Sequence, residues 1–334
     1  MRTEAGVVVG VDGSPGGDVA VAWAADEARR RCVGLHIVQV GDESIGDGLS
    51  PTTLAAVAAD LERHGNRLLS LAANAVATRQ PTVGVTATYR RGRAADVLIE
   101  VSDSTTLLVL GRHGTGENSD AIPGAVSHKV AAYGRCPVVV VPLSFGQVAD
   151  THPAAVIVGV GRSDEAMSAL DAGFQHAQRT HAKLVGIRVW GEVDWAHYSG
   201  TYTPQTAERW RQASEHILDD CVGRLRHQYP SVAVETRLVR GRVSDVLLDA
   251  ASDADLLLIG GPSSYGVRTS RLGWIGTQLF AQAPGPVEIV SWPLIGSERP
   301  AVGVAAGDRP GPAMPTVRAR SADLTEEVHP SRTR

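Results

Sequence analysis

The sequence predicts an α/β protein built from two tandem, doubly wound, five-stranded parallel sheets, followed by a disordered C-terminal tail. Three observations lead to this fold class. When the chain is shifted along itself by 149 residues, its landmarks coincide without a gap. Each copy alternates strand-like and helix-like segments, which is typical of parallel sheets covered on both faces. Residues 295–334 show no apolar period at all.

The 149-residue offset indicates a duplicated domain, because solenoid repeats are far shorter, about 20 to 50 residues. We therefore predict one domain over residues 1–146 and a second over 150–294. The coinciding segments are Val7–Val11 with Val156–Val160, Arg91–Arg93 with Arg240–Arg242, Leu108–Gly111 with Leu257–Gly260, and Pro137–Val138 with Pro286–Val287. Residues that the fold needs should persist in both copies, whereas a binding site can persist in only one.

The first half of the first copy reads as strand, helix, strand and helix. Residues 6–11 form a continuous apolar run, as a strand buried on both faces requires. Ser14-Pro15 then begins an alanine-rich helix that runs to about Arg31, and residues 35–40 predict the second strand. Apolar residues spaced by three, four and seven give the second helix one apolar stripe, which consists of Leu54, Val57, Leu61, Leu68 and Ala75.

The second half of this copy is predicted from alternation and from its boundary residues. The fourth strand runs into Gly111, and two prolines enclose the last strand. The predicted strands are 83–89, 106–110 and 138–141, and the predicted helices are 93–102 and 125–133.

The second copy repeats this order and then gives way to the tail. Its predicted strands lie near 155–160, 184–190, 232–239, 255–259 and 287–290. The tail, 295–334, is rich in Pro, Arg, Gly, Ser and Thr from residue 299 onward. Such a segment cannot bury enough apolar surface to offset the entropy of ordering it, so we predict disorder.

Composition narrows the classes of function. The formal net charge is −4, so no overall basic field attracts nucleic acid or an anionic membrane. Three cysteines without a short spacing indicate neither a disulfide framework nor a zinc site. Residues 1–5 contain no apolar signal region, and no run approaches the ~20 apolar residues that span a bilayer. We therefore expect a reduced, cytoplasmic protein.

Polar and glycine residues follow the first and fourth strands, where an open doubly wound sheet binds its ligands. Asp12-Gly13-Ser14 follows the first, and Gly111-Arg112-His113-Gly114 follows the fourth, with Gly124 opening a helix after nine more residues. Glycines and a helix N-terminus predict a phosphate cradle, and Asp12 suits ribose hydroxyls. Ordinary turns remain the alternative, because the sequence has neither a P-loop nor a GxGxxG fingerprint.

Three motifs together resemble the universal stress protein family. They are the opening Val-Val-Val-Gly-Val-Asp-Gly-Ser, the spacing Gly-x2-Gly-x9-Gly, and the closing Cys-Pro-Val-Val-Val-Val-Pro at 136–142. The resemblance covers residues 6–142 and, more weakly, 155–293. It implies a Rossmann-like, five-stranded fold of the adenine nucleotide alpha hydrolase-like type, which in one branch of the family binds ATP.

The resemblance also implies roles for individual residues. These are Asp12 on the ribose and adenine side, Val40 beside the base, and Gly111, His113, Gly114, Gly124, Ala125, Val126 and Ser127 around the phosphates. Family members cover the apolar edge of the last strand by pairing two domains. Here 287–290 would cover 138–141 within one chain as a pseudo-dimer, and further assembly into a homodimer stays open.

Two departures from the family pattern weaken the expected ATP site. Ala125 stands where the family has Ser or Thr, and the lost hydrogen bond is worth about 1.5–3 kcal/mol. That is roughly one to two powers of ten in affinity, unless Ser127 compensates. Glu117 and Asp120 in the intervening loop would repel phosphates unless a divalent cation such as Mg²⁺ bridges them.

The second copy departs further, so we predict a degenerate site there. Gly161, Ser263 and Trp274 replace Asp12, Gly114 and Ala125, although Gly260 and Gly273 persist. Arg268 and Arg271 could catch an anion or simply be solvated loop charges. Trp190, Trp195, Tyr198 and Tyr202 form either a stacking or partner-binding loop, or one that folds back on its domain.

The resemblance, together with these patterns, implies an ATP-binding, non-enzymatic stress-response regulator or sensor that acts through its first domain. The histidines lack the spacing of a metal site, and no serine lies in a nucleophile-elbow motif. Two alternatives remain: a slow nucleotide hydrolase, and an interaction scaffold that binds no nucleotide.

Overall fold

The computed structural model describes residues 5–42, 50–114, 124–146, 154–191, 203–261 and 272–290. The predicted tail and the loop that holds Glu117 and Asp120 lie outside these residues, as do Trp195, Tyr198 and Tyr202. Within the described ranges, no helix combines the length and the apolar character that crossing a membrane requires.

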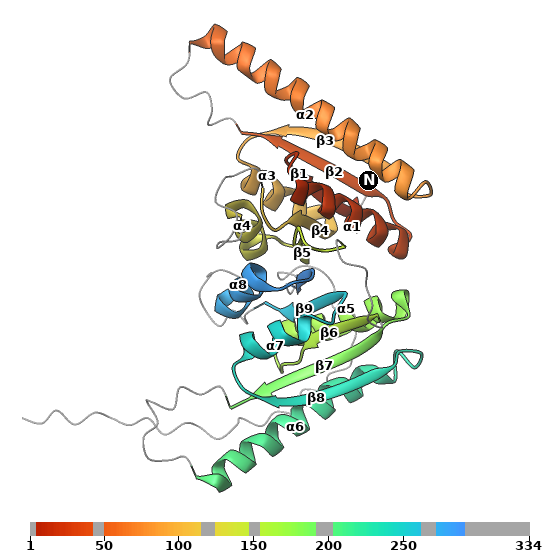
Figure 1. The fold of residues 1–334 in the computed structure, drawn as a ribbon, viewed down its shortest axis with the longest axis vertical. Helices are drawn as coiled ribbons and strands as arrows, with labels where there is room; N and C mark the ends of the chain where they lie inside the picture. The colour runs from red at the N-terminus through yellow and green to blue at the C-terminus, as the bar shows by residue number, and fades with distance from the viewer. Residues whose placement is uncertain are drawn as a thin grey trace, which may run out of the picture. The chain divides into compact units, whose positions relative to one another are not determined.

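Both copies fold as alternating strands and helices, as predicted (Figure 1). The first copy consists of β1 (Ala5–Val11), α1 (Pro15–Arg31), β2 (Leu35–Gly41), α2 (Pro51–Arg79), β3 (Val85–Arg91), α3 (Ala94–Val101), β4 (Thr105–Gly111), α4 (Ala125–Tyr133) and β5 (Val138–Val141). The second copy consists of β6 (Ala155–Gly159), α5 (Asp164–Thr180), β7 (Lys183–Trp190), α6 (Pro204–Arg226), β8 (Val234–Arg240), α7 (Val243–Ala251), β9 (Leu256–Gly260), α8 (Gly273–Gln282) and β10 (Val287–Val290).

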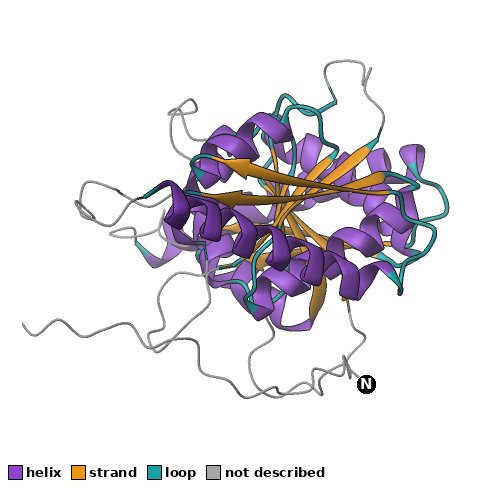
Figure 2. Cartoon of the chain, turned by 90° about the horizontal axis from the view of Figure 1, so that it is seen from below, coloured by secondary structure: helices purple, strands orange, loops and turns teal. Residues whose placement is uncertain are grey.

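The strands form one ten-stranded sheet in the order β3-β2-β1-β4-β5-β10-β9-β6-β7-β8. The strand pairs within each copy are parallel, and β5 pairs with β10 antiparallel. Each half is doubly wound, because its winding reverses between its first and fourth strands. Helices cover both faces of the sheet (Figure 2). The two predicted five-stranded parallel sheets are therefore present and joined through their last strands.

The join has approximate twofold symmetry, because residues 149 apart face one another across it. Val139 of β5 pairs with Glu288 of β10. On one face of the sheet, Glu27 Oε2 of α1 lies 3.6 Å from His176 Nδ1 of α5. On the other face, His128 Nε2 of α4 lies 3.3 Å from Thr277 Oγ1 of α8. The predicted pairing of 138–141 with 287–290 within one chain is confirmed.

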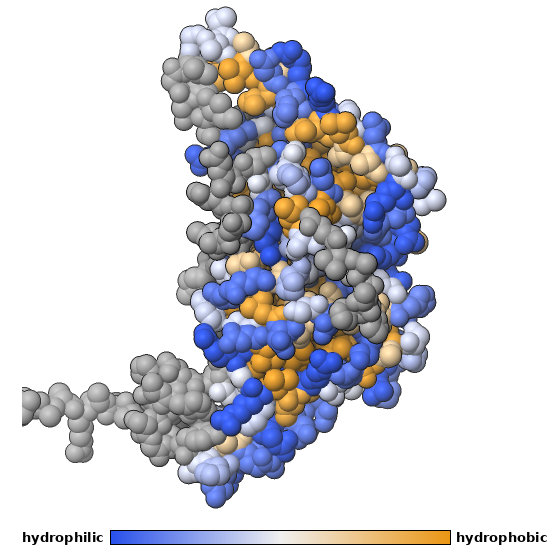
Figure 3. Space-filling model, viewed as in Figure 1, coloured by the Kyte–Doolittle hydropathy of each residue, from blue (hydrophilic) through white to orange (hydrophobic). Residues whose placement is uncertain are grey.

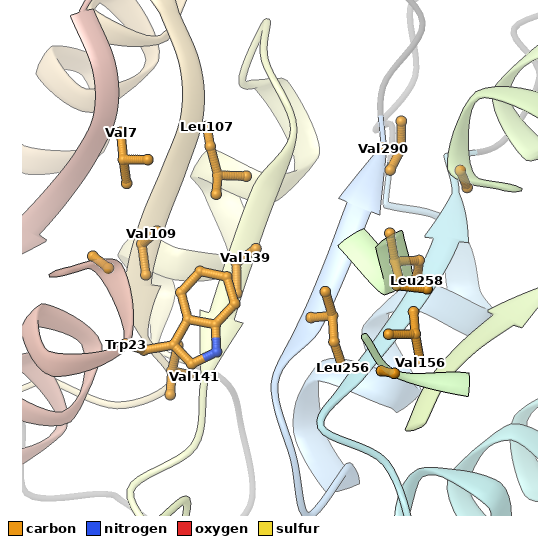
Figure 4. Packing of buried hydrophobic residues seen from close by; sticks show 14 of the residues in the cluster. Val7, Trp23, Leu107, Val109, Val139, Val141, Val156, Leu256, Leu258 and Val290 are labelled. Atoms are coloured by element: carbon orange, nitrogen blue, oxygen red, sulfur yellow. The ribbon is translucent and has the colours of Figure 1, made fainter. Parts of the chain in front are cut away.

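Apolar side chains form one core on each face of the sheet, and each core includes residues of both copies. The core under α1, α2, α5 and α6 holds the longer helices to the sheet. Figure 4 shows part of it, where Trp23 of α1 lies beside Val109, Val139 and Val141 of the first copy, and Val156 and Leu258 lie in the second copy. The joined halves thus share continuous hydrophobic layers.

Charged side chains are buried where α1 meets α5. Glu27 has no exposed surface, and its carboxylate contacts Arg31 Nε at 2.6 Å, Arg30 Nη1 at 3.5 Å and Arg179 Nη2 at 3.7 Å. Burial opposes ionisation, but contacts with His176 and Arg31 outweigh it and lower the pKa of Glu27 to about 2. Burial raises the pKa of the neighbouring Glu288. The interface between the copies therefore contains a specific charge arrangement as well as an apolar core.

The predicted apolar stripe of α2 is partly wrong. Leu54 is 44% exposed and Ala75 is also exposed, whereas Leu69 and Val76 are buried. The prediction followed steps of seven residues, and a straight helix drifts about 20° per heptad from such a repeat. Over a helix of 29 residues, the buried face has moved to the following positions. Apolar side chains consequently lie among hydrophilic ones over α2 at the top of Figure 3.

Candidate functional site

The site is framed by the carboxyl ends of β1 and β4, which are neighbours in the sheet. Their register pairs Val9 with Val109, so the segments that follow both strands emerge side by side. This is the point at which the winding of the first half reverses, and a doubly wound sheet binds its ligands there.

Asp12 is exposed and shapes the turn after β1. Its Oδ1 accepts hydrogen bonds from the Ser14 backbone N–H at 3.0 Å and from Ser14 Oγ at 2.6 Å. Ser14 Oγ in turn accepts from Gly17 N at 3.1 Å and so caps α1. This chain of bonds fixes the carboxylate in position at the mouth of the site.

Glycines let three backbone segments pack directly against one another. A Cβ on Gly111 would come within 2.7 Å of the Gly16 carbonyl oxygen, and one on Gly114 within 2.4 Å of Asp12 Oδ2. A Cβ on Gly16 would likewise come within 2.7 Å of the carbonyl oxygen of His113. None of these three glycines has a positive φ, so close approach to backbone atoms, and not turn geometry, requires Gly16 and Gly111, whereas Gly114 approaches the Asp12 carboxylate. The alternative of ordinary turns is therefore disfavoured for these glycines.

The start of α4 faces this glycine cluster. Gly124 precedes the helix, and among the described residues no side chain caps it. The first-turn N–H groups of Ala125, Val126 and Ser127 thus lie at the positive end of the helix dipole. Ala125 and Val126 are exposed. These amides are available to an anion in a way that the capped start of α1 is not.

The Ser127 hydroxyl is committed to the protein. The residue is buried, and its Oγ donates to the carbonyl oxygens of Arg112 at 3.1 Å and Gly124 at 3.0 Å. Gly124 N also donates to the Arg112 carbonyl at 2.9 Å. The hydroxyl fastens the start of α4 to the end of β4, so a ligand would meet the amide of Ser127 instead of its hydroxyl.

The structure brings most of the predicted site residues to one edge of the sheet. Val11 pairs with Gln39, so Asp12 and Val40 are the next residues on neighbouring strands. Val40 is half-buried against the core under α3, and His113 is half-buried within the glycine cluster. Val40 therefore flanks the cluster, while the other predicted residues form it.

Arg112 has a role that sequence reasoning missed. Its side chain is buried, and its Nη2 donates to the carbonyl oxygen of Ala283 in the second copy. Burial lowers the pKa of Arg112 to about 10. The 149-residue offset could have indicated this role, because the position of the second copy that is equivalent to Arg112 holds the uncharged Gly261. The loop that carries His113 and Gly114 is thus tied directly to the other half of the chain.

The equivalent edge of the second copy keeps the close packing but not the carboxylate. A Cβ on Gly260 would lie 2.5 Å from Ala166 N, and Ser163 caps α5 as Ser14 caps α1. Gly161 replaces Asp12, and Trp274, 56% exposed, stands at the start of α8 beneath Arg242, 5.7 Å from its ring centre. The two copies thus share the glycine packing and the helix cap, whereas the side chains that a ligand would meet at this edge differ.

The remaining predicted residues of the second copy are only partly described by the structure. Ser263, Arg268 and Arg271 lie outside the described residues. Trp190 is described, and the guanidinium of Arg240 lies 5.6 Å from its ring centre. Among the described residues, no cluster of three or more His, Cys, Asp or Glu side chains is arranged to hold a metal ion.

Comparison with known proteins relates both copies of the chain to one family. The model of the universal stress protein family matches residues 6–142 and again 154–291. The universal stress protein Rv2623 of Mycobacterium tuberculosis is 26% identical over 84% of this chain and 95% of its own length. A universal stress protein structure from Archaeoglobus fulgidus covers 86% of this chain and 99% of its own, with a TM-score of 0.65 and 15% identity.

Proposed function

This chain is a tandem member of the universal stress protein family, and we propose that its first domain binds ATP as a non-enzymatic stress-response regulator or sensor. One observation carries the proposal: the glycine cluster between β1, β4 and α4 places open backbone amides opposite the fixed carboxylate of Asp12. That pairing matches a ligand with anionic phosphates at one end and ribose hydroxyls at the other.

Each residue has a role in this proposal. Asp12 would accept hydrogen bonds from the ribose, and Val40 would contact the base. The phosphates would be held by the backbone around Gly111, His113, Gly114 and Gly124 and by the first-turn amides of Ala125, Val126 and Ser127, with Mg²⁺ as an accompanying cation. The committed hydroxyl of Ser127 supports a weakened site, because it cannot replace the side chain that Ala125 lacks.

The proposal assigns ATP binding to the first domain alone. Gly161 offers no carboxylate to a ribose, and the indole of Trp274 stands where a phosphate would approach the start of α8. No hydrolysis is proposed, since a ribose ligand is the role that best suits Asp12. We also propose that the chain works in the cytoplasm.

Nucleotide released from purified protein and calorimetry together test the proposal. Freshly purified chain is denatured and any released nucleotide is identified, and the apo protein is then titrated with ATP and Mg²⁺. We expect binding that weakens about tenfold or more in Asp12→Ala, because a charge-assisted hydrogen bond is lost. Asp60→Ala, which removes an exposed carboxylate on α2, is the matched control and should bind like the unaltered chain.

Three outcomes would contradict the proposal. If millimolar ATP produces no binding heat and no thermal shift, the result favours the interaction scaffold that binds no nucleotide. Steady turnover of ATP that disappears in Asp12→Ala would instead identify a slow hydrolase. Binding that Asp12→Ala leaves unchanged would move the nucleotide away from the edge of β1 and β4.

A further inference from the structure

The second domain carries a site of a different kind at its own edge. We propose that Arg162 and Arg188, beside the ends of β6 and β7, bind the phosphoryl group of a small phosphorylated molecule. This site is separate from the ATP site proposed for the first domain and does not depend on it.

The proposal starts from a reversal of charge between equivalent positions. At the first domain's edge these positions hold Asp12, Gly13 and Gln39. In the second domain they hold Gly161, Arg162 and Arg188. One carboxylate has thus been removed and two guanidinium groups have been added at the same place in the fold.

Arg188 is held in place but is not neutralised. Its Nη1 donates to the Val160 carbonyl oxygen at 3.0 Å, which aims the side chain at the end of β6. Its Nε is buried and has no hydrogen-bond partner among the described residues. Burial lowers the pKa of Arg188, and repulsion from Arg162 lowers it further. Gly159 pairs with Ile187, so Arg188 lies beside Val160, two residues before Arg162 at the end of β6.

No described side chain forms an ion pair with either arginine. Cys221 lies beside Arg188 and donates through Sγ to the Gly161 carbonyl oxygen at 3.6 Å, but burial raises the pKa of this thiol, so it stays neutral. Asp220 on the same helix is paired with Arg224 at 2.8 Å. Asp164 and Glu165 follow Arg162 in sequence and lie in the first turn of α5, where the helix dipole favours acidic groups.

A phosphoryl group is a better ligand for such a pair of cations than a single carboxylate would be. Taking a guanidinium partly out of water without a counter-charge costs free energy, which an incoming anion recovers. A phosphate dianion can neutralise both arginines, and their planar N–H groups match its oxygens in paired hydrogen bonds.

Calorimetry on the full chain with inorganic pyrophosphate tests the site. Arg188→Gln introduces the residue of the first domain, and Arg162→Ala truncates an exposed side chain with little consequence for folding. Each change should weaken pyrophosphate binding about tenfold, the effect of losing one hydrogen bond to a charged group. Arg226→Gln, in the exposed last turn of α6, removes the same charge elsewhere in this domain and should stay within about twofold.

The result is decisive in each direction. If the unaltered chain binds no pyrophosphate at millimolar concentration, the proposal is wrong. Binding that survives both Arg162→Ala and Arg188→Gln would also overturn it and would assign pyrophosphate to another place, such as the first domain. Asp12→Ala separates the two proposals, because it should weaken ATP binding in the first domain and leave pyrophosphate binding at Arg162 and Arg188 unchanged. If Arg188→Gln lowers the melting temperature of the protein, pyrophosphate binding by Arg162→Ala alone tests the proposal.

Discussion

In the first domain, Asp12 closes a glycine-lined edge opposite the open start of α4, whereas in the second domain Gly161 and Arg162 occupy that edge and Trp274 stands at the start of α8. Both domains nevertheless keep the packing of a glycine against the first turn of a helix, through Gly111 and Gly260. The comparison separates what the fold needs from what a ligand needs. Close backbone packing belongs to the fold, and the charge placed upon it belongs to the site.

The interface between the domains teaches a complementary lesson. Glu27 and His176 occupy equivalent positions and meet across the approximate twofold axis, and so do Val139 and Glu288. If two first domains paired in this way, Glu27 would face a second glutamate, and two second domains would place Glu288 against Glu288. The divergence of these positions therefore favours pairing between unlike domains.

The largest expected effect comes from removing the carboxylate at the centre of that interface. Glu27→Gln should lower the free energy of unfolding by about 3–5 kcal/mol, because it leaves Arg31 and Arg179 without their buried counter-charge. Urea unfolding measures the loss. Glu100→Gln removes an exposed carboxylate paired with Arg90 and should cost less than about 1 kcal/mol. Equal losses in the two variants would show that the interface charges are unimportant.

The exchange Glu27→His with His176→Glu sharpens this comparison. The two positions are related by the twofold axis, so the exchanged pair can form again, and part of the lost stability should return. Recovery should be incomplete, because Arg31 has Thr180 as its equivalent in the second domain. If the double variant loses as much unfolding free energy as the two single variants lose together, the result would contradict pairing across the axis.

Acid should weaken the same interface. The folded-state pKa of Glu27 is about 2, below its ordinary 4.5, so its stabilisation is complete above pH 4.5 and is lost as pH falls toward 2. The difference amounts to about 3 kcal/mol at 1.36 kcal/mol per pKa unit. Urea unfolding between pH 6 and 2.5 should show this loss in the unaltered chain and a shallower one in Glu27→Gln. Parallel pH profiles would exclude Glu27 as the cause.

Overpacking the shared frame should affect both domains alike. Gly111→Ala and Gly260→Ala each place a Cβ within 2.7 Å of backbone atoms, which should cost about 1–3 kcal/mol in unfolding free energy. Gly84→Ala is the control, because nothing lies within 4 Å of the added carbon. Only Gly111→Ala should also weaken ATP binding. If Gly260→Ala weakened it equally, the site would not be confined to the first domain.

Much of this arrangement was predictable from sequence, for identifiable reasons. Buried parallel strands such as β1 and β5 are continuous apolar runs, and the glycines of the site follow the strands that meet at the reversal of winding. Arg112, Glu27 and Glu288 were not predicted, because a charge that is buried between domains looks in sequence like any surface charge. The 149-residue offset held the missing signal, since it aligns Glu27 with His176.

The smallest expected change would restore the family's pattern at the first site. Ala125→Ser adds a hydroxyl at the exposed first turn of α4, beside amides that no side chain caps. We expect about tenfold tighter ATP binding by calorimetry, about 1.4 kcal/mol, because the new donor can reach an anion. Thr277→Ser changes a hydroxyl residue at the interface between α4 and α8 and should leave affinity unchanged. Unaltered affinity in Ala125→Ser would mean that phosphates do not approach the start of α4, and the contrast between the two domains would then rest on Asp12 alone.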